Sequence, residues 1–226
     1  MAKGGRIGLT LGLLAVALVV IIYTVIALLS EPQTIDFTAN HQPGQPVNIT
    51  LQTVGSVGPN YSNPTWVSYM TLSPQGQWEH TTLWDVPPNT RINMTIIQYD
   101  SGSPLRNQQI GQVTGTFGNV ATINGRPFRV INSNSSTGNG VAHTFSMPSL
   151  GVNVPLYGNS GNANLCGAAP CTLKSPHNII RFSFVSPSSG NVRWQCFVPC
   201  GLAWLYGNGG PMSTIGYMGG FMKVVS

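Results

Sequence analysis

Charged residues are scarce in this sequence. Its 226 residues include five acids, ten lysines and arginines, and four histidines. So few titratable groups leave little room for general acid–base catalysis, and the sequence motifs of serine hydrolases, zinc peptidases, phosphate loops and dinucleotide-binding folds are absent. The bases form no cluster or stripe of the kind that binds nucleic acid. We therefore predict that the chain is not an enzyme on its own and has no nucleic-acid partner.

The shortage of carboxylates also bears on stability, because acid unfolding acts mainly through groups that change their protonation. We expect stability to change little as the pH falls from about 6 to about 3, which suits an acidic exterior. Low charge does not indicate disorder here. Five Trp, seven Tyr and eight Phe are enough aromatic residues for a packed core.

One long uncharged run, Ile7–Leu29, lies near the N-terminus. A helix of this length spans about 34 Å, enough to cross the hydrocarbon core of a membrane. The run is longer than the apolar region of a signal peptide, so we predict a transmembrane anchor over residues 1–30. Lys3 and Arg6 precede the run, which places the N-terminus in the cytoplasm and the domain of residues 31–226 outside the cell membrane.

The outer domain shows no helical periodicity of any length. Short runs of β-branched and aromatic residues alternate with Gly, Pro, Asn and Ser, which predicts an all-β sandwich. The predicted strands are Val47–Val54, Trp66–Leu72, Arg91–Tyr99, Asn119–Ile123, Pro127–Asn132, Ala142–Met147, Asn178–Val185, Asn191–Phe197 and Gly220–Val225. Asn124-Gly125 has the composition of a type I′ hairpin turn.

A second hairpin is predicted around the turn Ser186–Gly190. The segments Arg181–Phe184 and Arg193–Cys196 on either side alternate polar with apolar residues, as two paired strands with one buried face would. This arrangement places Cys196 at the end of a core strand, where a loop begins.

The four cysteines form two pairs in the sequence. Cys166 and Cys171 flank a four-residue loop, and in an oxidising exterior they are expected to form a disulfide. Cys196 and Cys200 are four positions apart. Together with one histidine and a late methionine they offer the soft and borderline ligands that copper selects.

These residues lie in segments that resemble a known family. His143 precedes Ser146–Gly151, Cys196-x-x-x-Cys200 precedes a glycine, and Met218 opens the C-terminal strand. In this order, over roughly residues 115–226, the segments resemble subunit II of haem-copper terminal oxidases. The resemblance implies a cupredoxin-like Greek-key β-sandwich. It also implies a large haem-bearing membrane subunit as partner, within a respiratory electron-transfer complex.

The resemblance further implies the role of each residue in a dinuclear copper centre. His143 would be an imidazole ligand, and Cys196 and Cys200 would be thiolates shared by two copper ions. The main-chain carbonyl of Val198 would be a weak ligand, and Met218 the thioether ligand.

The chain departs from the family at the second histidine ligand. Trp204 stands in its place, and Leu205–Tyr217 enlarges the loop before the methionine. One nitrogen ligand leaves a second copper ion undersupplied, so an empty, vestigial centre is favoured, with Cys196 and Cys200 joined in a disulfide. A functional dinuclear centre and a single copper site are the alternatives.

Other histidines and methionines are expected to be structural. His41 and His80 lie in polar loops and are expected to be solvated, and the spacing of His80 and His177 does not suggest that either completes the centre. Met212 and Met222 are expected to fill core or loop space.

Three functions fit these observations. The first is a membrane-anchored subunit that resembles terminal oxidase subunit II, with a degraded copper centre, in a quinol-oxidising complex. The second is a stand-alone electron carrier that holds one copper ion through His143, Cys196 and a methionine. The third is a copper-free structural β-sandwich in another membrane complex.

Overall fold

The computed structural model describes residues 3–29, 33–55, 66–102, 104–132, 140–159, 166, 169–200 and 210–225. The chain divides into two compact units, Met1–Glu31 and Pro32–Ser226. Trp204 and most of the loop before Met218 lie outside the described residues.

The first unit contains one α-helix, α1 (Lys3–Leu29), which covers the predicted uncharged run. Large apolar side chains are exposed along it, among them Leu11, Leu18 and Ile22. Within the described part of the chain, no helix is both long enough and apolar enough to cross a membrane. The helix is thus present, and its role as a membrane anchor stays a prediction.

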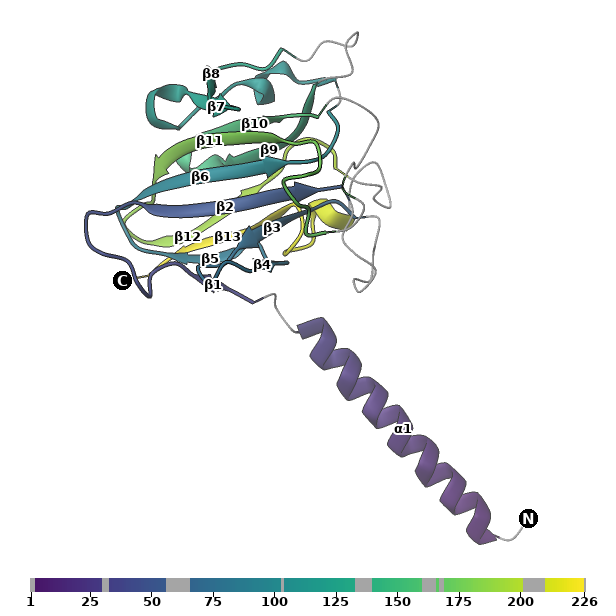
Figure 1. The fold of residues 1–226 in the computed structure, drawn as a ribbon. Coiled ribbons are helices and arrows are strands. Elements are labelled where there is room, and N and C mark those ends of the chain that lie inside the picture. Colours follow the sequence, from purple (N-terminus) through teal and green to yellow (C-terminus); the bar gives the residue numbers. More distant parts are fainter. Residues whose placement is uncertain are drawn as a thin grey trace. The chain divides into compact units, whose positions relative to one another are not determined.

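The second unit is a sandwich of two mixed β-sheets (Figure 1). In spatial order, one sheet contains β1 (Ile35–Asp36), β5 (Leu83–Val86), β13 (Gly219–Val224), β12 (Gly190–Gln195), β9 (Val141–Met147) and β10 (Val152–Tyr157). The other contains β4 (Trp78–Glu79), β3 (Ser68–Leu72), β2 (Val47–Val54), β6 (Arg91–Gln98), β11 (Asn178–Val185), β7 (Ala121–Ile123) and β8 (Arg126–Phe128). Short 3₁₀ helices occupy Gln108–Gly111, Phe117–Asn119, Pro148–Leu150 and Gly210–Met212.

The predicted strands all overlap strands of the sandwich. Four strands were not predicted, namely β1, β4, β5 and β10, and two of these contain only two residues. The predicted hairpin turn at Asn124-Gly125 is confirmed, because it joins the antiparallel strands β7 and β8 and both of its residues have positive φ.

Alternation explains which face of each strand forms the core. In β6 the side chains of Ile92, Met94 and Ile96 are buried, and the residues between them are partly exposed. The neighbouring β11 repeats this pattern, with Phe182 directly opposite Met94. Because successive side chains of a strand point to opposite faces, these residues form one inner wall of the sandwich.

Aromatic rings fill the space between the sheets. Trp84 stacks on Trp194 with their ring centroids 4.7 Å apart, and Phe145 and Tyr69 lie 5.0 Å and 5.1 Å from Trp194. All four side chains are fully buried. The indole N–H of Trp194 donates to the carbonyl of Thr82 at 3.2 Å, so the polar group of this ring has a partner.

The predicted hairpin around Ser186–Gly190 is wrong. The strands before and after it, β11 and β12, lie in different sheets, and β12 pairs with β13 and β9. Each strand buries one face in the common core, so alternation alone cannot distinguish a hairpin from a crossing between sheets. Ser186 fixes the crossing, because its hydroxyl donates to the carbonyl of Pro87 at 2.7 Å and accepts from the N–H of Thr90 at 2.9 Å.

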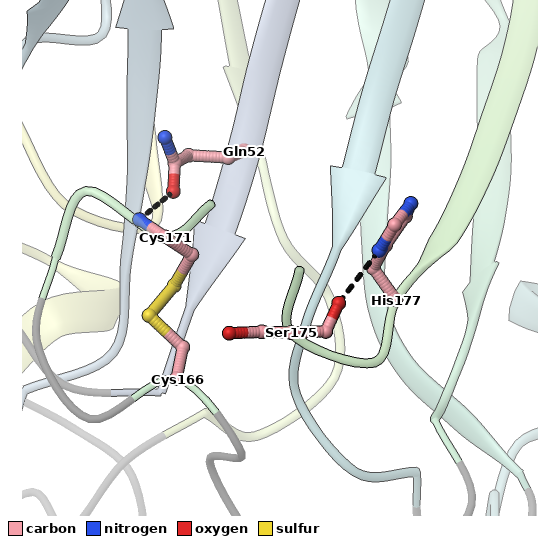
Figure 2. Close-up of a disulfide and its surroundings, with 5 residues drawn as sticks. All are labelled: Gln52, Cys166, Cys171, Ser175 and His177. Atoms are coloured by element: carbon pink, nitrogen blue, oxygen red, sulfur yellow. Dashed lines mark hydrogen bonds between the residues drawn. A yellow bond between two sulfur atoms is a disulfide. The ribbon is translucent and has the colours of Figure 1, made fainter. Parts of the chain in front are cut away.

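A disulfide between Cys166 and Cys171 lies against the outer face of the seven-stranded sheet (Figure 2). Both cysteines are buried in a small apolar cluster with Val54, Met70 and Tyr99. The loop is also tied to β2, because the side-chain oxygen of Gln52 accepts the Cys171 N–H at 2.7 Å. The two bonded cysteines therefore cover the sheet beside Tyr99.

Candidate metal centre

His143 lies on β9 with its side chain directed into the sandwich. Val141, Phe145 and Met147, at alternate positions of the same strand, belong to the central core, so His143 shares their face. Only 2% of the residue is exposed.

Cys196 follows the last residue of β12. Its N–H donates to the carbonyl of Met218 at 2.8 Å, which extends the pairing of β12 with β13. Its sulfur accepts the N–H of Thr144 at 3.3 Å, and the next N–H, of Phe197, donates to the Thr144 hydroxyl at 2.8 Å. The start of the cysteine loop is therefore fixed on β9, directly beside His143.

Cys196 and Cys200 are both buried free cysteines. Their sulfurs lie 3.2 Å apart, beyond the roughly 2.05 Å of a disulfide, so the expected disulfide between them is not formed. The carbonyl of Val198 lies between them, 3.0 Å from the Cys200 sulfur and 3.4 Å from the Cys196 sulfur. Spacing in the sequence did not reveal this, because it brings the two sulfurs close without fixing their state.

The two ring nitrogens of His143 face different partners. Nδ1 lies 2.9 Å from the sulfur of Cys200, and Nε2 lies 3.2 Å from Oδ2 of Asp100. One ligand atom each from His143, Cys196 and Cys200 lies within 4.8 Å of the other two. A single ion bonded to two sulfurs at about 2.3 Å requires them to be no more than about 4.6 Å apart, and these sulfurs satisfy that condition.

The two thiols differ in acidity. Burial disfavours the thiolate of Cys196, but its hydrogen bonds with Cys200 and His143 and the charge of His143 outweigh burial and hold the pKa of Cys196 well below its ordinary value. Burial and the neighbouring Cys196 thiolate raise the pKa of Cys200 well above its ordinary value. Cys196 is therefore the more readily ionised of the two, and the thiolate is the form of cysteine that binds a metal.

His143 and Asp100 form a charged pair in the metal-free centre. Burial works against the imidazolium, but the Asp100 carboxylate and the Cys196 thiolate outweigh it and raise the pKa of His143 to about 9. Burial also works against the ionised Asp100, and its hydrogen bond with His143 nevertheless lowers the pKa of this carboxyl. Metal binding at this centre must displace the protons of the histidine and the second thiol.

The donor set fits one soft metal ion. Two thiolates and one imidazole are ligands that copper selects, and the carbonyl of Val198 adds an oxygen beside both sulfurs. Among the described residues, the group that could hold a metal contains one histidine. A pair of copper ions needs a nitrogen ligand for each, so these described ligands serve one ion better than two.

The methionines predicted near the centre are placed by the strands. Met218 is fully buried in the central core with Cys196, and its carbonyl holds the Cys196 N–H. Met222 is fully buried farther along β13, and Met212 packs against the same core from a 3₁₀ helix. Met222 is therefore a core residue, and the partly buried Met212 packs against the core.

His41, His80 and His177 lie outside the group of described residues that could hold a metal. His80 was expected to be solvated, but its Nε2 lies 2.9 Å from the Ser68 hydroxyl and its ring contacts the ring of Tyr217, with centroids 4.8 Å apart. Burial lowers the pKa of His80 to about 4. Nδ1 of His177 lies 2.7 Å from the carbonyl of Ser175 (Figure 2), and His41 is partly exposed.

Two residues of the centre were not predicted. Asp100 contacts the histidine, and Tyr69 supports it, because the Tyr69 hydroxyl donates to the carbonyl of Thr144 at 2.9 Å. A signal for Asp100 was present in the sequence. It is one of only five acids, and it follows directly after a predicted core strand.

No known protein-family model matches this chain, and no curated protein matches it. Solved structures of rusticyanin are similar to it in part. One, titled as a copper protein, has 12% identity and a TM-score of 0.34, and the match covers 87% of this chain and 85% of that one. Another, from Thiobacillus ferrooxidans, has 14% identity and a TM-score of 0.33, with 87% and 84% covered. Similarity at this level assigns neither a family nor a function.

Proposed function

We propose that this chain is a cupredoxin-like copper protein that transfers electrons through one copper ion held by His143, Cys196 and Cys200. One observation carries the proposal: an imidazole nitrogen and two free sulfurs, from two distant segments, converge within 4.8 Å in the buried core. Buried cysteines without a metal are ordinary small apolar residues. Two buried sulfurs beside a buried imidazole are polar groups that are costly to bury without a partner, and a bound metal would supply one.

The protein groups would act on the ion in distinct ways. The Cys196 thiolate and the Cys200 sulfur would supply soft ligands, and His143 would supply the nitrogen through Nδ1, which already faces Cys200. Copper in such a site supplies one-electron redox chemistry. The aromatic core behind the ligands excludes water and keeps them from moving when the charge of the site changes.

The setting of this copper protein is also a proposal. The resemblance of the ligand segments to subunit II of terminal oxidases supports a place beside a large haem-bearing membrane subunit. The exposed apolar side chains around α1 support anchoring of the chain in the membrane with the sandwich on the outer side.

Copper analysis of the full-length chain tests the proposal. We expect about one copper ion per chain, a thiolate-to-copper absorption band, and two free thiols per chain once the copper is removed. Protein film voltammetry should show a reversible one-electron wave. Two copper ions per chain would support the dinuclear centre instead. Zinc in place of copper would overturn the redox role. A Cys196–Cys200 disulfide without metal would support the copper-free structural β-sandwich.

The membrane setting needs a separate experiment. The chain would be purified from native membranes in mild detergent, and its partners identified together with their haem content. Co-purification with a haem-bearing subunit would support the oxidase setting. A copper-loaded chain without such a subunit would support the stand-alone electron carrier.

A further inference from the structure

Asp100 contacts the ring nitrogen of His143 that faces away from the cysteines. Its Oδ2 lies 3.2 Å from Nε2, and Nδ1 on the other side of the ring lies 2.9 Å from the Cys200 sulfur. Asp100 follows β6 in the seven-stranded sheet, and His143 belongs to β9 in the other sheet. The contact therefore joins the two layers of the sandwich at the candidate centre.

The position of Asp100 is itself well determined. Its Oδ1 accepts the N–H of Ser101 at 2.7 Å. Its main-chain carbonyl accepts the side-chain amide of Gln98 at 2.9 Å and the N–H of Asn159 at 2.8 Å. The main chain of Asp100 and one carboxylate oxygen are thus fixed by hydrogen bonds. The other carboxylate oxygen, Oδ2, faces the histidine.

The solvent exposure of the two partners differs in a way that fits a supporting role. The side chain of His143 is 3% exposed and that of Asp100 is 21% exposed. The imidazole is therefore buried, and the carboxylate beside its Nε2 is the more exposed of the two groups. A carboxylate that accepts a hydrogen bond from Nε2–H keeps the proton of a neutral ring on Nε2 and leaves the lone pair on Nδ1, where the sulfurs are.

We propose that Asp100 is the positioning residue of the candidate metal centre, which sets the tautomer and orientation of His143 so that Nδ1 is the ligand atom. The metal-binding part of this inference rests on the proposed function. The part that concerns the ring alone does not, because it follows from the contact of Asp100 with Nε2 in the protein without metal. Partners of this kind commonly change metal affinity by about 10- to 100-fold.

Two substitutions separate the charge of Asp100 from its hydrogen bond. Asp100→Ala removes both, and Asp100→Asn retains an oxygen that can accept from Nε2 without the charge. Asp85→Asn is the matched control. Asp85 lies on β5, so this substitution removes one acid outside the metal-binding group. We expect copper affinity to fall about 10- to 100-fold in Asp100→Ala and less in Asp100→Asn, with the control unchanged.

Nitrogen-15 NMR of the histidine ring provides a readout that a purely structural role would not change. In metal-free, reduced protein above about pH 10, the wild-type ring should be neutral with its proton on Nε2. Asp100→Asn should retain this tautomer, and Asp100→Ala should give a mixture of the two tautomers. A wild-type tautomer in Asp100→Ala would overturn the proposal, as would unchanged copper affinity in that variant.

The two readouts also separate this inference from the proposed function. A wild-type chain that binds no copper would disprove the metal site, and the NMR comparison would still decide whether Asp100 sets the ring. Copper binding that is equal in the wild type and Asp100→Ala would leave the metal site intact and disprove the role of Asp100.

Discussion

The imidazole Nδ1 of His143 lies 2.9 Å from the sulfur of Cys200, although the two residues are 57 positions apart in the sequence. The contact depends on strand pairing. Gln195, the last residue of β12, pairs with Ser146 of β9, and this register brings the loop after β12 beside His143. The centre is therefore a product of sheet register and not of a local motif.

Removal of the histidine should abolish copper binding without unfolding the sandwich. We expect His143→Ala to lower copper affinity by more than about 100-fold, because it removes the one nitrogen ligand of the described group. Competition with a chelator of known affinity measures this loss. His41→Ala is the control, since His41 lies in a turn outside that group, and similar losses in the two variants would contradict the assignment of His143.

Tyr69 should contribute to stability more than to metal binding. Its buried hydroxyl donates to the carbonyl of Thr144, next to the candidate ligand His143. Tyr69→Phe removes this bond and keeps the ring, so we expect a loss of about 1 kcal/mol in the free energy of unfolding. Urea denaturation measures the loss. The copper stoichiometry should stay at the wild-type value, and a variant that folds normally but binds no copper would show that the hydroxyl has a direct role.

The sequence predicted the strands well, because the alternation of buried and exposed side chains is a local pattern. Alternating buried residues mark β6 and β11, and the cysteine spacing marks the loop that carries Cys196 and Cys200. Asp100 could not be predicted as a partner of His143, because the two residues belong to different sheets and only the packing of the layers brings them together.

Two errors have related causes. The turn between β11 and β12 was predicted to join paired strands, and a strand that buries one face carries the same pattern whether its neighbour in the chain lies beside it or across the core. The disulfide between Cys196 and Cys200 was expected from the resemblance to the oxidase subunits, in which the two sulfurs lie close together, with copper absent. The direction of their side chains is set by contacts with His143 and Val198, which are not visible in the sequence.

The disulfide between Cys166 and Cys171 should stabilise the sandwich without affecting the centre. Closing so short a loop is worth about 2 kcal/mol, and the two bonded cysteines pack in one buried cluster with Tyr99. We expect the double variant Cys166→Ser/Cys171→Ser to lose about this much free energy of unfolding and to bind copper as the wild type does. Reduction of the wild-type protein is a second test, and an unchanged unfolding midpoint after reduction would contradict the prediction.

Two neighbouring glycines of β13 should differ in their tolerance of a methyl group. A Cβ at Gly220 would overlap the carbonyl oxygen of Thr82, whereas one at Gly219 would lie 3.1 Å from the Cβ of Gln195. We expect Gly220→Ala to cost about 2 to 3 kcal/mol, and Gly219→Ala less than about 1 kcal/mol. Thermal unfolding of the two variants measures the difference. Equal losses of stability in the two would show that Thr82, just before β5, moves aside to accept the methyl group.

His80 should make stability depend on pH in spite of the scarcity of acids. Burial lowers the pKa of His80 to about 4 in the folded protein, and in the unfolded chain it is about 6.5. Between these values the unfolded chain binds a proton that the folded protein excludes. The contribution of the neutral His80 ring to stability is therefore complete above about pH 6.5 and falls as the pH is lowered to about 4, by about 1 to 2 kcal/mol after allowance for solvent screening of a partly exposed ring.

Urea unfolding of the wild type and His80→Gln at several pH values measures this loss. The variant should be less stable near neutral pH, because it loses the contact of the ring with Tyr217, and its stability should change less between about pH 6.5 and about pH 4. His41→Gln should retain the wild-type dependence, since it removes one histidine and leaves His80 in place. If His80→Gln loses as much stability as the wild type on acidification, the dependence arises from carboxylates. In that case the few acids, and not the buried histidine, determine how this domain withstands an acidic exterior.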